Sequence, residues 1–401
     1  MKINLPEIQF PKLNIQKQDN IGKYKLPSKV IYCKKCVISN QRPRIVLDEE
    51  GVCGACRYAD YKNTKIDWNK RDLELQELCD KHRRKDGQFD VIVPCSGGKD
   101  SAFVAHMLKT KYGMNPLTVT WAPNLYMDVG WKNIQHLIHT GLHNITWTPD
   151  GETHRILTRL SFIHLGDPFQ PFIYGVKTFP LRLAVMFNIP LIVYGENGEV
   201  EYGGDMKNAN SPCHDTRDDL KKHYFSGMNP ESWVDYGLAK EKLEYYLAPS
   251  QESLAKVGVQ CHFMGYYKRW VPQEMYYYAC ENTGFAANPE GRSEGTYSKY
   301  ASLDDRLDGF HFYMAHAKFG IGRATSDAAH EVRDGHISRE EAIALVKRYD
   351  GEFPGQYFDE FLDYTGLSKE EFENVVNSHR SDHLWEKIDN QYKLKTPVWE
   401  S

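Results

Sequence analysis

The stretch FDVIVPCSGGKDS at residues 89–101 decides the fold of this chain. Its first half, residues 89–95, is an apolar run with the length of a buried β-strand, and a helical pattern follows over residues 100 to about 112. The glycines between them, Gly97 and Gly98, let the backbone turn sharply. The stretch therefore predicts a strand, a tight turn and a helix N-terminus in immediate succession.

Strands and helices alternate along the rest of the central region. Further strands are expected over residues 117–121, 144–147, 191–194 and 259–264, and helices over residues 67–84, 130–142, 152–165 and 177–187. Such alternation implies parallel strands joined by right-handed crossovers, with helices on both faces. The predicted fold class is α/β, a doubly wound parallel sheet that binds ligands beyond the carboxyl ends of its strands.

Four regions are expected along the chain. They are an extended arm (1–28), a four-cysteine unit (29–62), the central α/β domain (63–330) and a C-terminal helical region (331–401). In the last region, residues 338–341 and 368–371 both fit the capping box, in which a serine and a glutamate satisfy free amides at a helix start. The charged and aromatic segment from residue 206 to about residue 255 fits a lid or an insertion.

Composition and charge exclude several classes of protein. Hydrophobic residues make up 41% of the 401 positions, so the chain is neither disordered nor collagen-like. The net charge of -4 provides no overall basic field for nucleic acid. The first residues contain no apolar signal segment, and residues 181–194, the most apolar later stretch, are interrupted by polar residues and proline. We expect a cytoplasmic protein with no membrane insertion.

Two Cys-x2-Cys pairs predict a metal site. Cys33 and Cys36 are separated by 16 residues from Cys53 and Cys56, and four thiolates in this spacing suit tetrahedral zinc. A closed four-sulfur shell predicts a structural ion; iron–sulfur ligation is the minor alternative. Basic residues nearby, Lys34, Lys35, Arg42, Arg44 and Arg57, are read as a solvated face more readily than as a nucleic-acid contact.

The turn after the first strand has the chemistry of an anion site. Backbone amides of the turn and of the new helix point outward, into the positive end of the helix dipole, so pyrophosphate is a natural ligand. Lys99 is followed by Asp100, whereas the Walker A loop needs serine or threonine there.

The sequence Ser-Gly-Gly-x-Asp-Ser after an apolar strand resembles the PP-loop of the ATP pyrophosphatases (adenine nucleotide alpha hydrolase-like proteins), which include GMP synthetase, NAD synthetase, asparagine synthetase and tRNA thiolases. In that group the loop holds the β- and γ-phosphates while a substrate oxygen attacks the α-phosphate. The resemblance implies that Ser96, Gly97, Gly98 and Ser101 bind phosphate, that Lys99 adds positive charge, and that Asp100 helps to hold Mg²⁺.

A narrower resemblance points to one reaction. The four-cysteine knuckle together with VPCSGGKDS (93–101), TWAP (120–123) and YGEN (194–197) resembles the N-acetyl sugar amidotransferases, over most of residues 30–350. These enzymes convert an acetamido group into an acetamidino group on sugars of bacterial surface glycans, including lipopolysaccharide O-antigen and nonulosonic acids. The resemblance implies ATP, Mg²⁺, an adenylated imidate, release of AMP and pyrophosphate, and a sugar substrate that is nucleotide-linked.

Other polar and aromatic residues are weaker candidates for the same site. Trp121 lies at the carboxyl end of the second strand and either lines the nucleotide pocket or belongs to the core. Glu196 and Asn197 follow a later strand and are candidates for contact with magnesium or sugar, with a catalytic role for Glu196; Asp205 is a weaker acidic candidate.

Several cations are candidates for phosphate contact. Lys177 and Arg182 would neutralise the α-phosphate, although each is equally well read as a surface cation. Lys299, Lys318 and Arg323 lie among glycines and are candidates to close over pyrophosphate.

The source of ammonia is expected to be another polypeptide. Residue 2 is lysine and no Gly-x-Cys-x-Gly elbow occurs, so the two familiar settings of a glutaminase nucleophile are missing. The family resemblance implies a partner similar to the glutaminase subunit of histidine biosynthesis.

Two alternatives stay open. A PP-loop tRNA thiolase would need a catalytic cysteine, for which Cys95, Cys213, Cys261 and Cys280 are available, and a basic RNA surface. A zinc-ribbon interaction module with a vestigial loop is the alternative from another class.

Overall fold

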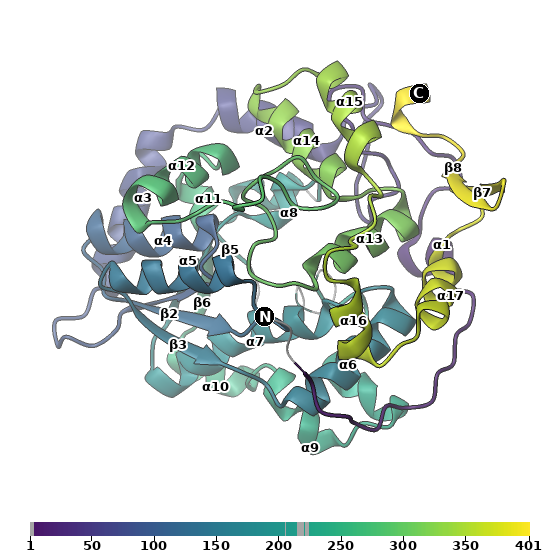
Figure 1. Ribbon diagram of the computed structural model, residues 1–401. Coiled ribbons are helices and arrows are strands. Elements are labelled where there is room, and N and C mark those ends of the chain that lie inside the picture. The colour runs from purple at the N-terminus through teal and green to yellow at the C-terminus, as the bar shows by residue number, and fades with distance from the viewer. Residues whose placement is uncertain (1–3, 205, 215–219, 221–223) are drawn as a thin grey trace.

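A computed structural model describes residues 4–204, 206–214, 220 and 224–401 of the chain. Its centre is a sheet with the strand order β3-β2-β1-β4-β6-β5 (Figure 1). The strands are β1 (Val91–Pro94), β2 (Pro116–Trp121), β3 (His143–Trp147), β4 (Leu191–Tyr194), β5 (Cys213–His214) and β6 (Gln260–Phe263). All pair in parallel except β5, which runs antiparallel to β6 at the edge. Asp205 lies outside the described residues.

The order of the strands creates a switch point beside β1. The chain runs from β1 outward through β2 to β3, then returns to place β4 on the other side of β1. Crossovers therefore leave the carboxyl ends of β1 and β4 in opposite directions, which opens a crevice for a ligand. The loop after β1, predicted to hold phosphate, lies at this point.

Side chains of β1 alternate between two cores because successive residues of a strand point to opposite faces. Val91 and Val93 pack against helices of one face, whereas Ile92 packs against those of the other. The first face is covered by α3 (Trp68–His82), α4 (Lys99–Thr110), α5 (Asp128–His139), α11 (Met264–Tyr267) and α12 (Pro272–Thr283), the second by α6 (Gly151–Leu165), α7 (Gln170–Phe187), α9 (Lys240–Leu243) and α10 (Gln251–Val257) (Figure 1). The predicted doubly wound α/β fold is confirmed.

Segment predictions agree with these bounds, with two exceptions. The helix expected over 177–187 begins at Gln170, because Pro171 suits a first helical turn and does not end the pattern. The described part of residues 206–255 includes Trp233 and Tyr246, both buried against α7, so that part belongs to the core under the sheet.

The C-terminal region is helical, as predicted, with a hairpin at its end. It contains α13 (Asp308–Phe319), α14 (Arg323–Asp334), α15 (Arg339–Tyr349), α16 (Phe358–Thr365), α17 (Lys369–His379), β7 (Trp385–Ile388) and β8 (Gln391–Leu394). Both predicted capping boxes are present, at Ser338 with Glu341 and at Ser368 with Glu371. Residue 330, where the central domain was predicted to end, lies inside α14.

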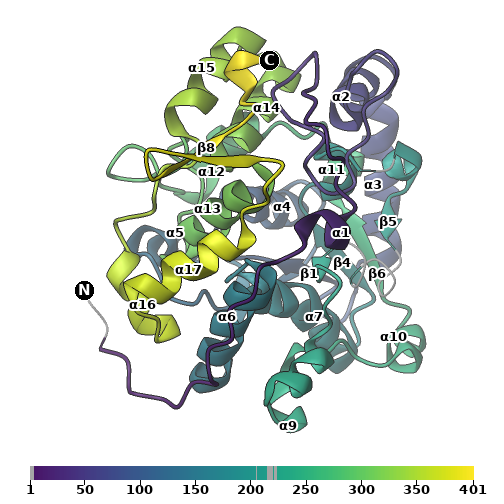
Figure 2. The ribbon, with the colours of Figure 1, turned by 90° about the vertical axis from the view of Figure 1, so that its right-hand side faces the viewer.

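The N-terminal arm and the C-terminal region pack together on α6. The arm runs past α6 and α17 to the short helix α1 (Asn20–Tyr24) (Figure 2). Arg155 of α6 donates to the carbonyl oxygens of Pro6 in the arm (2.6 Å) and of Tyr364 in α16 (2.9 Å). Phe310, Phe361 and Phe162 form one aromatic core across these elements.

Within the described ranges, no helix combines the length and the apolar content that crossing a membrane requires.

A C-terminal segment reaches back over the start of α5. The Met127 amide donates to the Asp304 carbonyl oxygen (3.1 Å), and Gly130 faces the backbone of Leu303 and Asp304. A Cβ on Gly130 would lie 2.4 Å from the Leu303 oxygen and 2.5 Å from Asp304 Cα. Glycine is required because two backbones meet here.

We therefore expect Gly130→Ala to lower the free energy of unfolding by about 1–3 kcal/mol, the usual effect of overpacking. Helix propensity alone would favour alanine by about 1 kcal/mol, so the direction tests the contact. Gly151→Ala, at a helical glycine whose added Cβ meets nothing within 4 Å, is the matched control. Urea unfolding measures both. Equal stabilisation by the two substitutions would show that the 303–304 segment does not contact α5.

Candidate active site and metal centre

Four cysteines gather into one cluster before the sheet. The ligand atoms of Cys33, Cys36, Cys53 and Cys56 all lie within 4.8 Å of one another, and the four side chains are buried. The Sγ atoms of Cys33 and Cys56 are 3.8 Å apart, as are those of Cys36 and Cys53. Four sulfurs about 2.3 Å from a zinc ion would form a tetrahedron with edges of about 3.8 Å, so the cluster fits zinc. Complete thiolate ligation makes such an ion structural.

Backbone amides and a C-terminal arginine support the cluster. The amides of Lys35 and Cys53 donate to Cys33 Sγ at 3.4 and 3.3 Å. Arg339 of α15 donates to the carbonyl oxygens of Cys33 (3.4 Å) and Cys36 (3.2 Å). The four-cysteine unit is therefore attached to the C-terminal region.

The turn predicted to hold phosphate, residues 96–101, is named here the phosphate loop. Gly97 has φ +86°, and a Cβ there would lie 2.7 Å from the Ile134 backbone nitrogen, so glycine is required. Gly98 precedes α4 and, within the described chain, no side chain caps that helix. The first amides of α4 are therefore available to an anion, with the helix dipole behind them. Ser101 Oγ donates to the Gly98 carbonyl oxygen (3.0 Å).

An aromatic cavity of about 310 Å³ lies above the loop at the ends of β1, β2 and β4. Its lining includes Ser96, Gly98 and Ser101 of the phosphate loop, and Val119, Trp121, Phe172, Val176, Phe179 and Tyr194. Trp121 lines the cavity and also belongs to the core: it is 3% exposed and packs on Gly175, where a Cβ would lie 2.0 Å from the indole. An apolar chamber ending in a phosphate loop is suited to a nucleoside triphosphate.

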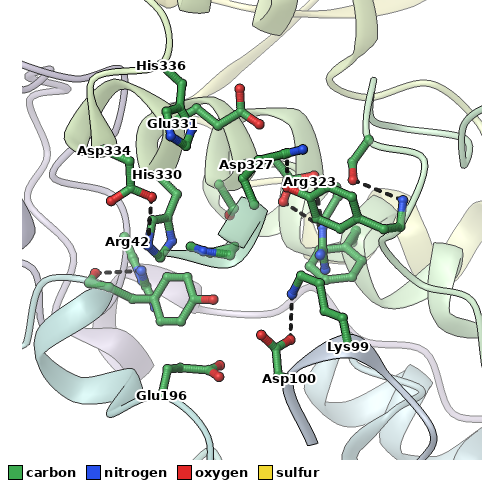
Figure 3. Close-up of a pocket in the computed structure, with 17 residues that line it drawn as sticks. Arg42, Lys99, Asp100, Glu196, Arg323, Asp327, His330, Glu331, Asp334 and His336 are labelled. Carbon is green, nitrogen blue, oxygen red and sulfur yellow. Dashed lines mark hydrogen bonds and ion pairs between the residues drawn. The ribbon is translucent and has the colours of Figure 1, made fainter. Parts of the chain in front are cut away.

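A second chamber, the charged cavity, adjoins the first and has a volume of about 430 Å³. Asp100 and Glu196 line both cavities, so the two chambers meet at these carboxylates. Lys99 enters the charged cavity and pairs with Asp100 (Nζ to Oδ2, 2.5 Å). Figure 3 shows Lys99, Asp100 and Glu196 on one side and residues of α14 on the other.

Asp100 and Glu196 have the electrostatics of a metal site. Burial and the nearby Asp100 raise the pKa of Glu196, while Lys99 and Lys177 oppose that shift. The Oδ1 atom of Asp100 is buried and accepts no hydrogen bond from any described residue. Carboxylates that repel each other in a cavity beside a phosphate loop are the ligands that Mg²⁺ uses with phosphate substrates. The two residues therefore fit a Mg²⁺ ion, which the chain would hold together with a substrate phosphate.

A third acidic side chain, Asp304, contacts the loop from the segment between α12 and α13. Burial and the neighbouring Asp308 raise the pKa of Asp304 to about 6, while a hydrogen bond from Ser96 opposes that shift. Asp304 therefore helps to fix the Ser96 hydroxyl.

The charged cavity is lined by residues of α14, of which only Arg323 was proposed from the sequence. One face of α14 supplies Arg323, Asp327, His330 and Asp334, at spacings of four, three and four, the periodicity of one helix face. Arg323 pairs with Asp327 at 3.0 Å. Burial lowers the pKa of His330 well below its usual range, so this imidazole is neutral. Arg42, from the loop between the cysteine pairs, enters from another side and donates to the Tyr202 carbonyl oxygen (2.5 Å).

Other sequence candidates lie at varying distances from the loop. Lys177 of α7 sits over the rings of Tyr194 (4.6 Å) and Tyr224 (3.8 Å), at the edge of the aromatic cavity. Asn197 is buried and its side chain accepts from the Glu199 amide at the start of α8 (Gly198–Glu201).

The other cations proposed for phosphate contact lie in different parts of the structure. Arg323 is the one among them that lines the charged cavity, whereas Lys318 lines a different one and Lys299 lies outside the described cavity linings. Arg182 donates to the carbonyl oxygens of Glu244 and Leu247, away from the phosphate loop. The structure therefore brings Lys99, Asp100, Glu196 and Arg323 together and leaves Arg182 apart.

Comparison with known proteins gives one family match. The model of the family "LPS biosynthesis protein WbpG-like, C-terminal domain" matches residues 294–398, the region that supplies α14 and Asp304 to the site. Among solved structures, NMN synthetase from Francisella tularensis is similar at 17% identity and a TM-score of 0.28, over 47% of this chain and 78% of that one. With a TM-score this low, the fold assignment rests on the topology described above. No curated protein matches the chain.

Loss of one cysteine ligand should remove the metal. We expect Cys33→Ser to lower bound zinc and the melting temperature together, because metal binding contributes folding free energy. Cys280→Ser, which removes a thiol outside the cluster, should change neither. Elemental analysis and thermal unfolding of the purified protein make the comparison. Full-length protein without zinc or iron at this cluster would refute the metal centre.

Substitution of Glu196 by glutamine should stabilise the folded protein at neutral pH. Because its pKa is raised in the folded state, the ionised carboxylate destabilises the fold as pH rises above the ordinary glutamate value. Glu196→Gln should therefore raise the melting temperature at neutral pH, and the gain should vanish in acid, where the carboxyl is protonated in both states. The exposed Glu77→Gln is the control. A Gln variant less stable than the parent at neutral pH would contradict this assignment.

Proposed function

We propose that this chain is an ATP-dependent amidotransferase that converts the acetamido group of a bacterial surface-glycan sugar into an acetamidino group, releasing AMP and pyrophosphate. The observation that carries the proposal is the meeting of two cavities at Asp100 and Glu196. One cavity has the form of a nucleotide site, and the other takes much of its lining from the region that matches the lipopolysaccharide-biosynthesis family.

The reaction needs an activated oxygen. An amide carbonyl oxygen is a poor leaving group, so the acetamido oxygen first attacks the α-phosphorus of ATP and the bond between the α- and β-phosphates breaks. Pyrophosphate leaves and an adenylated imidate remains. Ammonia then adds to the imidate carbon, AMP departs with the former acetamido oxygen, and protons are released.

The residues of the phosphate loop favour cleavage at this bond. Ser96, Ser101 and the first amides of α4 would bind the departing phosphates, and Lys99 with Arg323 would balance their charge. Mg²⁺ held by Asp100 and Glu196 would neutralise charge on the pyrophosphate. Lys177 of α7, whose Nζ lies over the ring of Tyr194 in the lining of the aromatic cavity, would act near the α-phosphate.

Acceptor and ammonia would occupy the charged cavity. Among its lining residues Glu331, whose carboxyl pKa is raised by burial, is the group best suited to accept a proton released when ammonia adds, whereas the lowered pKa of His330 makes that imidazole a weak base. Ammonia would come from a separate glutaminase, similar to the glutaminase subunit of histidine biosynthesis, which is why this chain needs no nucleophile of its own for glutamine.

The cysteine beside the loop argues for this reaction over tRNA thiolation. Cys95 lines the aromatic cavity, but burial raises the pKa of its thiol, and the thiol accepts a hydrogen bond from the Gly97 amide (3.3 Å). A protonated, buried thiol is a poor sulfur carrier.

The test combines ATP, Mg²⁺, ammonium and a panel of UDP- and CMP-linked N-acetyl sugars with the purified chain. We expect AMP and pyrophosphate in equal amounts with one sugar, together with exchange of oxygen for NH in that sugar by mass spectrometry. Ser96→Ala and Asp100→Asn should slow AMP formation about 100-fold or more. Asp80→Asn, an exposed change on α3, should not.

The dependence on nitrogen source completes this test. Activity with ammonium should rise with pH, since ammonia carries the attacking lone pair, and glutamine should serve only when a glutaminase is added. Glutamine-dependent amidine formation by this chain alone would overturn the two-protein scheme, and thiolation of tRNA would overturn the amidotransferase assignment.

A further inference from the structure

A third chamber, the basic cavity, has a volume of about 790 Å³ and lies where the arm, the four-cysteine unit and α13 meet. Both ribbon views place α1 beside α13 and α17 (Figures 1 and 2). Its cationic lining residues are Lys23, Lys25, Arg42, Arg44 and Lys318, and Asp167 is the sole carboxylate among its described lining residues. Arg44 pairs with Glu199, which lies outside this lining (Nη1 to Oε2, 2.6 Å), so the excess of positive charge comes from the three lysines and Arg42.

The one carboxylate is already committed. Asp167 Oδ1 is 2.8 Å from His311 Nδ1 and accepts from the Phe169 amide (3.0 Å). Burial opposes protonation of His311, yet Asp167 raises the pKa of that imidazole above its usual value. Burial lowers the pKa of Lys318 and of Lys23 and Asp167 opposes that shift in both, so this one carboxylate is shared among His311 and two lysines.

Lys318 is the most constrained of these cations. It is 5% exposed, and its Nζ donates to the Leu165 carbonyl oxygen (3.0 Å). Across the described ranges, no carboxylate lies within ion-pairing distance of Lys318, Lys23 or Lys25. Buried charges in proteins are normally paired or bind a ligand, so a buried ammonium group on a cavity wall indicates an anion.

The fold holds these cations in place. Asn20 of α1 is buried and donates to the His379 carbonyl oxygen (2.7 Å), and the ring of Tyr24 packs edge-on against Phe319 of α13 (5.0 Å). Desolvation within the cavity and repulsion by Lys318 lower the pKa of Lys23 to about 8. The arm therefore brings positive charge toward positive charge, which an anion between them would stabilise.

The basic cavity adjoins the proposed reaction site. Arg42, Phe312 and Ser326 line both it and the charged cavity, so one elongated ligand can occupy both. Its anionic end would contact Lys318 and Lys23 while its other end faces Lys99 and Asp100.

We infer that the basic cavity is an anion site in which Lys318, Lys23 and Lys25 hold a phosphate or diphosphate ester, and that the phosphate groups of the acceptor occupy it. The identity of the ligand as the acceptor rests on the proposed function, whereas the anion site itself does not. The shared chemistry is a phosphate or diphosphate ester, and a nucleoside diphosphate and inorganic diphosphate are separate probes of it.

Calorimetric titration tests this site without turnover. The full-length protein is first saturated with the α,β-methylene analogue of ATP, which occupies the phosphate loop, and UDP or inorganic diphosphate is then added. We expect binding of UDP in the presence of the analogue. Lys318→Met should weaken it about tenfold or more, as expected for loss of a charged contact, with no change in affinity for the analogue. Lys70→Met, an exposed change on α3, should leave both affinities unchanged.

The arm supplies a second variant in case Lys318→Met does not fold. Lys23→Gln with Lys25→Gln changes two side chains that line the cavity at its solvent-exposed edge, and should also weaken UDP binding. Wild-type affinity for UDP in whichever of these variants folds, Lys318→Met or the double glutamine variant, would overturn the inference. Loss of UDP binding when the analogue is present would also overturn it, because UDP would then occupy the phosphate loop. Comparison of UDP with inorganic diphosphate shows whether the nucleoside adds affinity.

The outcomes separate this inference from the proposed function. Turnover of a phosphate-free N-acetyl sugar without UDP binding would overturn the basic cavity and leave the amidotransferase standing. UDP binding in a protein that forms no amidine would leave the anion site standing and overturn the amidotransferase assignment.

Discussion

The close approach of Gly97 to the backbone of Ile134 is the constraint on which the site depends. No side chain fits between the loop and α5 there, and the chain turns from β1 into α4 within four residues, 95–98. The uncapped first turn of α4 is thereby aimed into the crevice between β1 and β4. A helix N-terminus at a switch point binds anions by its own amides and dipole, before any charged side chain is added.

Charged side chains from distant segments complete the site around this turn. Lys62 of α2 (Gly54–Thr64) is 1% exposed and pairs with Glu201 (3.1 Å), which in turn lies 3.6 Å from His330 of α14. This buried chain of polar side chains connects the four-cysteine unit to the wall of the charged cavity. Arg42, on the loop between the cysteine pairs, reaches the same wall. The four-cysteine unit thus supplies Arg42 to the charged cavity and contacts, through Lys62 and Glu201, the helix that forms its wall.

Local patterns predicted the features whose signals are contiguous in sequence. The apolar run before Gly97 predicted β1, the glycines predicted the turn, and the spacing of the cysteine pairs predicted their cluster. The hairpin at 385–394 was not predicted from the sequence. Its turn residues, Asp389 and Asn390, both have positive φ, the geometry of a type I′ turn, and asparagine and aspartate are residue types that favour such a turn. The polar residues of α14 recur at spacings of three and four in the sequence, but this pattern does not show which cavity that helix face lines. Lys23 and Lys318 are separated by most of the chain, and only tertiary packing brings them together.

An isotope label would test the proposed chemistry most directly. With ¹⁸O in the acetamido carbonyl of a turned-over sugar, attack of that oxygen on the α-phosphorus predicts one ¹⁸O atom in each AMP formed and none in pyrophosphate. Recovery of the label in water or inorganic phosphate, or formation of ADP in place of AMP, would contradict activation of the acceptor by this loop.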